Sequence, residues 1–129
     1  MMWEDVDLER SMFWGARRGD DITGVVRLEL DLPHALLGSL YVELEYREQG
    51  LGRRLVRYIE TEAMDRDVER LFLFSTEAGG FFQELSYDEV AVDETVDAVP
   101  EVPQVEWYRN HPNLLQQEVT FVKEFATQR

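Results

Sequence analysis

The fold is decided by the stretch Tyr46-Arg47-Glu48-Gln49-Gly50-Leu51-Gly52-Arg53-Arg54-Leu55. It follows the apolar run 36–42, which is typical of a buried strand, and it opens the amphipathic segment 51–64, which predicts a helix. The first backbone N–H groups of a helix lack partners and carry partial positive charge, so a strand, a tight turn and a helix start can hold an anion. Glycines at 50 and 52 would let that anion approach the backbone. Three arginines add positive charge: Arg47, Arg53 and Arg54.

Residues 47–52, Arg-Glu-Gln-Gly-Leu-Gly, resemble the Arg/Gln-x-x-Gly-x-Gly/Ala signature of the GNAT family, the Gcn5-related N-acetyltransferases. A dinucleotide-binding fingerprint does not fit, because its third glycine position is Leu55. Residues 76–87 also resemble the family's Ala-x-x-Phe-Tyr-x-x-x-Gly-Phe segment, with Phe82 where many members have a tyrosine. The alternative interpretation is an ordinary strand-to-helix turn.

The resemblance covers about residue 10 to the end and implies an α/β fold with a GNAT-like mixed sheet. At its centre we expect a β-turn-α unit that binds acetyl-CoA, and we expect a shortened N-terminal strand/helix region. Backbone groups of Tyr41 and Val42 would pair with pantetheine, and the turn would hold the pyrophosphate. The implied cofactor-binding residues are Leu40, Tyr41, Val42, Arg47, Glu48, Gln49, Gly50, Leu51, Gly52 and Arg53.

The implied reaction transfers acetyl from acetyl-CoA to an amine of a small molecule or a peptide. His34 and His111 are the only histidines, and a neutral imidazole suits proton removal near neutral pH. Tyr108 and Tyr87 are candidate acids in place of Phe82, and Glu29 is a weaker candidate facing the acceptor. For each of these residues a structural role is the alternative. No histidine spacing predicts a metal site, and we expect no metal.

The charge is strongly negative: 27 acidic residues stand against 13 basic ones, for a net charge of −14, and Lys123 is the only lysine. This composition resembles proteins of salt-loving organisms, especially haloarchaea, and an acidic protein of an ordinary cell is the alternative. Nucleic acid and anionic membranes are poor partners for such a surface. The chain has no cysteine and no apolar run of the ~18 residues that cross a bilayer. We therefore expect a cytoplasmic protein.

The hydrophobic pattern predicts one domain over residues 1–129. The expected elements are a helix at 1–11, strands at 12–17, 22–30 and 35–42, a helix at 50–66, a strand at 68–75, a short helix at 77–85, a strand at 87–92, a loop at 93–103, a helix at 105–110 and a strand at 115–125. The strand 12–17 would lie at an exposed edge, which predicts a homodimer that covers it. Two rival functions remain open: a non-catalytic acyl-CoA-binding or sensor protein, and a dimeric assembly module.

Overall fold

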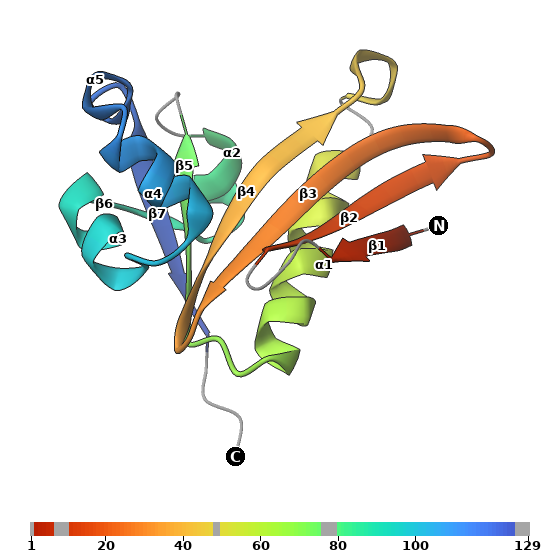
Figure 1. Ribbon diagram of the computed structural model, residues 1–129. Helices are drawn as coiled ribbons and strands as arrows, with labels where there is room; N and C mark the ends of the chain where they lie inside the picture. Colours follow the sequence, from red (N-terminus) through yellow and green to blue (C-terminus); the bar gives the residue numbers. More distant parts are fainter. Residues whose placement is uncertain (1, 7–10, 48–49, 76–79, 126–129) are drawn as a thin grey trace.

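The computed structural model describes residues 2–6, 11–47, 50–75 and 80–125 (Figure 1). Over these residues the chain forms strands, α-helices and one short 3-10 helix, η1. Their bounds are β1 Met2–Val6, β2 Ser11–Arg18, β3 Asp21–Asp31, β4 His34–Val42, η1 Leu44–Tyr46, α1 Leu51–Asp65, β5 Arg70–Ser75, α2 Gly80–Glu84, β6 Asp88–Val90, α3 Val92–Ala98, α4 Pro103–Arg109, α5 Pro112–Leu115 and β7 Val119–Glu124.

All the described strands join one mixed sheet in the order β1-β2-β3-β4-β5-β7-β6. Neighbouring strands are antiparallel except β4 and β5, which are parallel and connected through α1. Figure 1 shows β4 and β5 separating toward their carboxyl ends. The expected GNAT-like mixed sheet with a central β-turn-α unit is therefore confirmed.

The pairing of β4 with β5 is short. It runs from His34 opposite Arg70 to Leu37 opposite Leu73. Beyond this point β4 continues to Val42, paired on its other side with β3. The sheet is thus split along the carboxyl-terminal half of β4.

A β-bulge lies in the same half of β4. Gly38 pairs with Arg27 and Tyr41 pairs with Val25, so residues 39 and 40 of β4 stand opposite one residue of β3. Leu40 packs against the same core as Leu37, which a regular strand with alternating faces would not allow. The bulge therefore resets which side chains point to each face as the strand leaves β5.

Two hydrophobic cores cover the two faces of the sheet. The larger one packs α1 against the central strands, through side chains that include Leu55, Val56, Ile59 and Ala63. The smaller one lies on the opposite face beneath α3 and α4, and it contains Leu36, Phe72, Val99, Val102 and Val105. Among the described helices, none is both long and apolar enough to cross a membrane.

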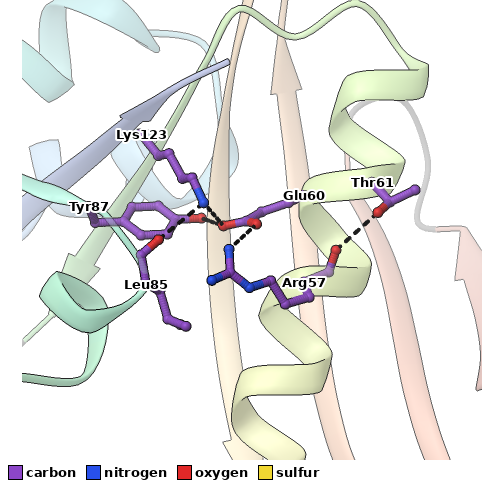
Figure 2. Close-up of polar contacts among 6 residues, drawn as sticks. All are labelled: Arg57, Glu60, Thr61, Leu85, Tyr87 and Lys123. Carbon is purple, nitrogen blue, oxygen red and sulfur yellow. Dashed lines mark hydrogen bonds and ion pairs between the residues drawn. The ribbon is translucent and has the colours of Figure 1, made fainter. Parts of the chain in front are cut away.

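A polar cluster lies at the edge of the larger core (Figure 2). Tyr87 donates its hydroxyl proton to Glu60 Oε2 at 2.8 Å, and Lys123 Nζ lies 3.2 Å from the same oxygen. Arg57 pairs with the other carboxylate oxygen at 2.9 Å, and Lys123 also donates to the Leu85 carbonyl. Glu60 is almost fully buried, so this cluster satisfies a carboxylate that α1 carries into the core. It ties α1 to β7 and to the segment after α2.

Three sequence predictions about secondary structure are wrong. Residues 2–6 form a strand instead of a helix, and because β1 pairs with β2, residues 12–17 are not an edge. Most of the expected loop 93–103 is helical, since α3 buries Thr95 and its neighbours Val99 and Val102 complete the smaller core. The last strand begins at Val119, because residues 112–115 form α5.

Other predicted elements are confirmed within a few residues, among them the β2–β3 hairpin, β4, α1 and β5. The predicted strand 87–92 shrinks to Asp88–Val90. The predicted helix 77–85 falls partly on residues 76–79, which lie outside the described residues, and α2 covers the rest. Only residues 7–10 separate β1 from β2, in agreement with a shortened N-terminal region.

Candidate active site

A groove lies where β4 ends and α1 begins, and we call it the α1 groove. Its volume is about 530 Å³. It is lined by Leu40, Tyr41, Val42, Arg47, Gly50, Gly52, Arg53 and Phe81. Of the described residues that the sequence assigns to the cofactor, all but Leu51 line it; Leu51 packs against the core instead. Glu48 and Gln49 lie outside the described residues.

The start of α1 is shaped to receive an anion. Gly50 caps the helix with a left-handed backbone, at a φ of 78°, and none of the described side chains caps it. The N–H of Arg54 donates to the Gly50 carbonyl at 3.1 Å, so the N–H groups of the preceding turn point out of the helix end. A Cβ on Gly52 would lie 3.5 Å from Phe81 and 3.8 Å from Val42, which are groove residues. Because Gly52 has no side chain, this part of the groove has more room.

Positive charge borders this helix start. Arg47 donates from Nε to the Val42 carbonyl at 2.9 Å, and its guanidinium stands 5.7 Å from the centre of the Tyr41 ring. These contacts hold the guanidinium beside the end of β4. Arg53 forms an exposed ion pair with Glu84 at 3.4 Å. In a chain with a net charge of −14, two arginines beside an uncapped helix start favour an anionic ligand at this point.

A second cavity lies beneath α4, on the face of the sheet opposite α1, and we call it the α4 cavity. Its volume is about 380 Å³, and it is lined by Arg27, Pro103, Gln104, Trp107 and Tyr108. Gly38 packs directly against one of its lining residues, since a Cβ there would lie 2.8 Å from Gln104 Oε1. The split half of β4 thus borders both spaces, with Gly38 at the α4 cavity and residues 40–42 at the α1 groove.

Tyr108 joins α4 to the β5 side of the split. Its ring lies 4.8 Å from that of Phe74 on β5, and its hydroxyl donates to Glu118. Burial, and then the hydrogen bond to Glu118, raise the pKa of Tyr108 to about 12. The hydroxyl is therefore protonated at neutral pH.

His111 follows α4 and packs on Trp107, a residue that lines the α4 cavity. Its ring stacks on that of Trp107 at 4.0 Å, and its Nδ1 lies 2.8 Å from the Trp107 carbonyl. Because a carbonyl only accepts, Nδ1 carries the proton in the neutral ring and the lone pair lies on Nε2. His111 is exposed.

His34 and Tyr87 lie elsewhere. His34 begins β4 and pairs with Asp31 at the far end of the strand, about 20 Å from Leu40 at a strand rise of ~3.3 Å per residue. Burial and the nearby Arg70 lower the pKa of His34. The hydroxyl of Tyr87 is engaged by Glu60, and burial raises its pKa. These positions argue against a role for either residue in chemistry at the split.

Sequence reasoning missed Arg27, Gln104 and Phe81. Arg27 and Glu29 are polar residues in the otherwise apolar strand 25–30, and that alternation was a usable signal for a polar site on one face of β3. Gln104 follows Pro103 at the start of a helix that the sequence did not place over the sheet. Phe82, at the family's tyrosine position, packs in the larger core against Tyr87 and Phe121.

The mixed sheet, split between β4 and β5 with a helix start at its opening, agrees with the family comparison. Residues 1–87 match the model of the acetyltransferase (GNAT) family, and the chain belongs to that family. Comparison with curated protein sequences found no match.

Solved structures share the fold at low identity. N-acetylglutamate synthase from Neisseria gonorrhoeae, complexed with coenzyme A and N-acetyl-glutamate, is 22% identical with a TM-score of 0.74 over 89% of this chain, which spans 26% of that protein. PaiA N-acetyltransferase from Thermoplasma acidophilum, in complex with coenzyme A, is 15% identical with a TM-score of 0.67 over 90% of this chain and 62% of its own. The ribosomal-protein-S18-alanine N-acetyltransferase from Escherichia coli is 16% identical with a TM-score of 0.68, over 95% of this chain and 74% of its own.

Proposed function

We propose that this chain is an N-acetyltransferase that moves an acetyl group from acetyl-CoA to a primary amine. The observation that carries the proposal is the α1 groove at the split between β4 and β5. Family membership and the coenzyme A complexes of two structural neighbours support it.

The residues present fit acetyl-CoA in chemical kind. The uncapped start of α1, with Gly50 and Gly52, suits the pyrophosphate, and Arg47 and Arg53 add charge. Apolar side chains of the groove suit the pantetheine arm, and they include Leu40, Val42 and Phe81. The edge of β4 that no longer pairs with β5 offers backbone groups to an extended ligand. The groove thus supplies the donor's binding energy and orientation.

The amine would enter from the α4 cavity, on the other side of the split. Its nitrogen attacks the thioester carbon, so that a C–N bond forms, the C–S bond breaks, the nitrogen loses a proton and the thiolate gains one. Holding both reactants at the split supplies the proximity that such a transfer needs. In this proposal His111 Nε2 accepts the amine proton, because it is the unprotonated nitrogen of a ring that stacks on Trp107, a residue of the cavity.

Tyr108 has a positioning role in this proposal. Its raised pKa, about 12, keeps the hydroxyl neutral, so it does not act as a base at neutral pH. It holds α4 against β5 through Phe74 and fixes Glu118. His34 takes no part, given its place at the opposite end of β4.

The test combines binding with turnover, both in about 1 M KCl. Calorimetry measures acetyl-CoA binding, and thiol release is followed with a panel of amines. We expect tight binding and amine-dependent release of CoA. Binding without release for any amine would favour the acyl-CoA-binding or sensor alternative, and no binding would favour an assembly role. The homodimer stays a prediction, and its original reason is gone because β1 covers the strand 12–17.

A further inference from the structure

Two carboxylates of β3 hold the segment that leads into α4. Glu29 Oε2 accepts the backbone N–H of Gln104 at 3.0 Å, and Asp31 Oδ2 accepts the backbone N–H of Glu101 at 2.9 Å. Glu29 and Asp31 are two residues apart on one strand, so their side chains lie on the same face of the sheet. We call these two contacts the β3 clasp.

The first turn of α4 needs such a partner. Its N-cap residue, Val102, has an apolar side chain that cannot cap the helix, and Pro103 at the next position has no N–H. The first bond within the helix runs from the N–H of Glu106 to the Val102 carbonyl at 3.1 Å. The N–H of Gln104 therefore precedes the helical ladder and must find its acceptor elsewhere. Glu29 supplies from β3 the oxygen that a capping side chain would otherwise supply.

The Glu29 side chain is itself held in place. It is fully buried, and its Oε1 lies 3.1 Å from Arg27 Nη2. The Arg27 guanidinium also stands 5.4 Å from the centre of the Phe13 ring. Arg27 lines the α4 cavity. One carboxylate thus connects a wall of the cavity to the first turn of α4.

The last turn of α4 is held on the other side of the split. Tyr108 contacts Phe74 of β5, and its hydroxyl donates to Glu118, which immediately precedes β7. Since β3 pairs with β4 and β5 pairs with β7, α4 joins the two halves of the split sheet. The same last turn carries Trp107, on which the ring of His111 stacks. The position of this aromatic pair therefore depends on both attachments of α4.

Resting on the acetyl transfer proposed above, we propose that the β3 clasp positions the acceptor side of the site, with Glu29 as its main positioning residue. Glu29 touches neither reactant. It acts through α4, whose place on the sheet sets where Trp107 and His111 stand relative to the amine. A misplacement of about 1 Å is enough to slow a transfer between two held reactants. Acetyl-CoA binding does not depend on the clasp, because the α1 groove has its own lining residues on the other face.

Two substitutions of Glu29 separate its acceptor atom from its charge. Glu29→Gln and Glu29→Met both remove the negative charge beside Arg27 and keep the length of the side chain. Only glutamine retains an oxygen that can accept the N–H of Gln104. The difference between the two variants therefore measures the contact with α4. Tyr87→Phe is the matched control for stability, because it removes a buried hydrogen bond in the larger core on the other face of the sheet.

The first measurement needs no turnover. Amides in the first turn of a helix exchange rapidly with solvent unless they have a partner outside the helix. We expect slow hydrogen exchange at the Gln104 amide in the parent and in Glu29→Gln, measured by NMR, and fast exchange in Glu29→Met. Equal protection of this amide in the parent and in folded Glu29→Met would overturn the proposal.

The second measurement is kinetic. Thiol release from acetyl-CoA is followed in ~1 M KCl with methylamine, glycinamide and spermidine. Glu29→Met should lower kcat/KM for the fastest of these amines at least about tenfold, while the Kd for acetyl-CoA stays within about twofold of the parent. Glu29→Gln should restore the rate to within about threefold of the parent. Tyr87→Phe should lower the melting temperature and leave both quantities as they are in the parent.

A second pair of variants covers the case in which Glu29→Met does not fold. Asp31 lies at the end of β3 and makes the outer contact of the clasp, so Asp31→Leu and Asp31→Asn repeat the comparison there. We expect about a threefold loss of kcat/KM for the amine in Asp31→Leu and a smaller loss in Asp31→Asn. Equal values in these two variants would then overturn the proposal.

The kinetic outcomes distinguish this inference from the proposed function. If folded Glu29→Met acetylates the amine as fast as the parent, the clasp has only a structural role and the inference fails, while the proposed function stands. A parallel loss of amine turnover and acetyl-CoA affinity would also overturn it, because the effect would then be general. If the parent releases no thiol with any of the three amines, the proposed function fails and the positioning role fails with it.

Discussion

Leu37 of β4 and Leu73 of β5 are the last pair at which these parallel strands are joined. β4 runs on to Val42 and β5 to Ser75, each still paired on its other side, to β3 and β7. Backbone groups that face the split have lost their strand partner, and such groups are satisfied by a ligand, by water or by another chain. The fold therefore has an opening where a central strand pair ends, with the α1 groove and the α4 cavity on its two sides.

Replacing Gly52 with valine should weaken acetyl-CoA binding at least about tenfold, or ~1.4 kcal/mol. The added Cβ makes ordinary contacts with Phe81 and Val42, so the cost falls on the space of the α1 groove and not on the core. Arg47→Ala should weaken binding less, because backbone N–H groups supply much of the hold on an anion. Calorimetry in molar KCl measures both, beside melting curves. If a folded Gly52→Val protein bound acetyl-CoA as tightly as the parent, the α1 groove would not be the acetyl-CoA site.

Replacing His111 with asparagine should lower kcat by about 10²–10⁴-fold, the usual value of a positioned general base. Acetyl-CoA affinity should be unchanged, since His111 is not among the residues that line the α1 groove. His34→Asn is the matched control and should retain the parent's rate. Equal rates for the parent and His111→Asn would refute the assignment.

Tyr108 should link stability to alkaline pH. Its pKa is raised from about 10 in the unfolded chain to about 12 in the fold, by burial and then by Glu118. The folded state thus holds the proton more tightly, so this contribution is complete below about pH 10 and is lost as the pH rises through about 12. Urea unfolding at pH 9 and at pH 11 should show a steeper loss for the parent than for Tyr108→Phe. Parallel losses would contradict the raised pKa.

Thermal stability should rise markedly between about 0.1 and 2 M KCl. The net charge of −14 makes the carboxylates repel one another, and at ~1 M salt the screening length falls to about 3 Å. Differential scanning calorimetry over this range is the measurement. A melting temperature that stays level or drops with salt would argue for an acidic protein of an ordinary cell.

Mutating the polar cluster around Glu60 should cost an unfolding free energy that does not depend on the salt concentration. Tyr87→Phe removes the hydroxyl that donates to Glu60 and should cost about 1–2 kcal/mol of unfolding free energy. Glu60 is buried, so the cost should be equal in ~1 and ~2 M KCl, where surface repulsion is already screened. Urea titrations of parent and variant give the two values. A cost that shrinks with salt would mean that the cluster is solvated.

The β4–α1 unit could be predicted because its signals are local. Periodicity marks α1, and Gly50 sits where the chain needs a positive φ before the helix. The groove residues on both sides of this turn follow from the same unit. A local pattern was enough because all of these residues except Phe81 lie in the single stretch 40–53.

The α4 cavity could not be predicted because it depends on long-range packing. Segment 93–103 is acidic and contains prolines, which suggested a loop, yet Val99 and Val102 fill a core with Leu36. That packing brings Gln104 over Gly38. The two residues are far apart in the sequence, so no local pattern predicts their contact. The strand β1 was missed for a similar reason. Its extended conformation depends on pairing with β2, and the sequence of β1 alone does not indicate that pairing.

Lys123 gives the Glu60 cluster a chemical consequence. It carries the only side-chain amine of the chain, and that amine is held by Glu60 Oε2 and the Leu85 carbonyl, with 19% of the side chain exposed. If the α1 groove binds acetyl-CoA as proposed, the chain would thus offer that acyl donor no freely exposed lysine side chain. An amine-reactive label should therefore react slowly with Lys123 in the folded chain and faster once the chain unfolds.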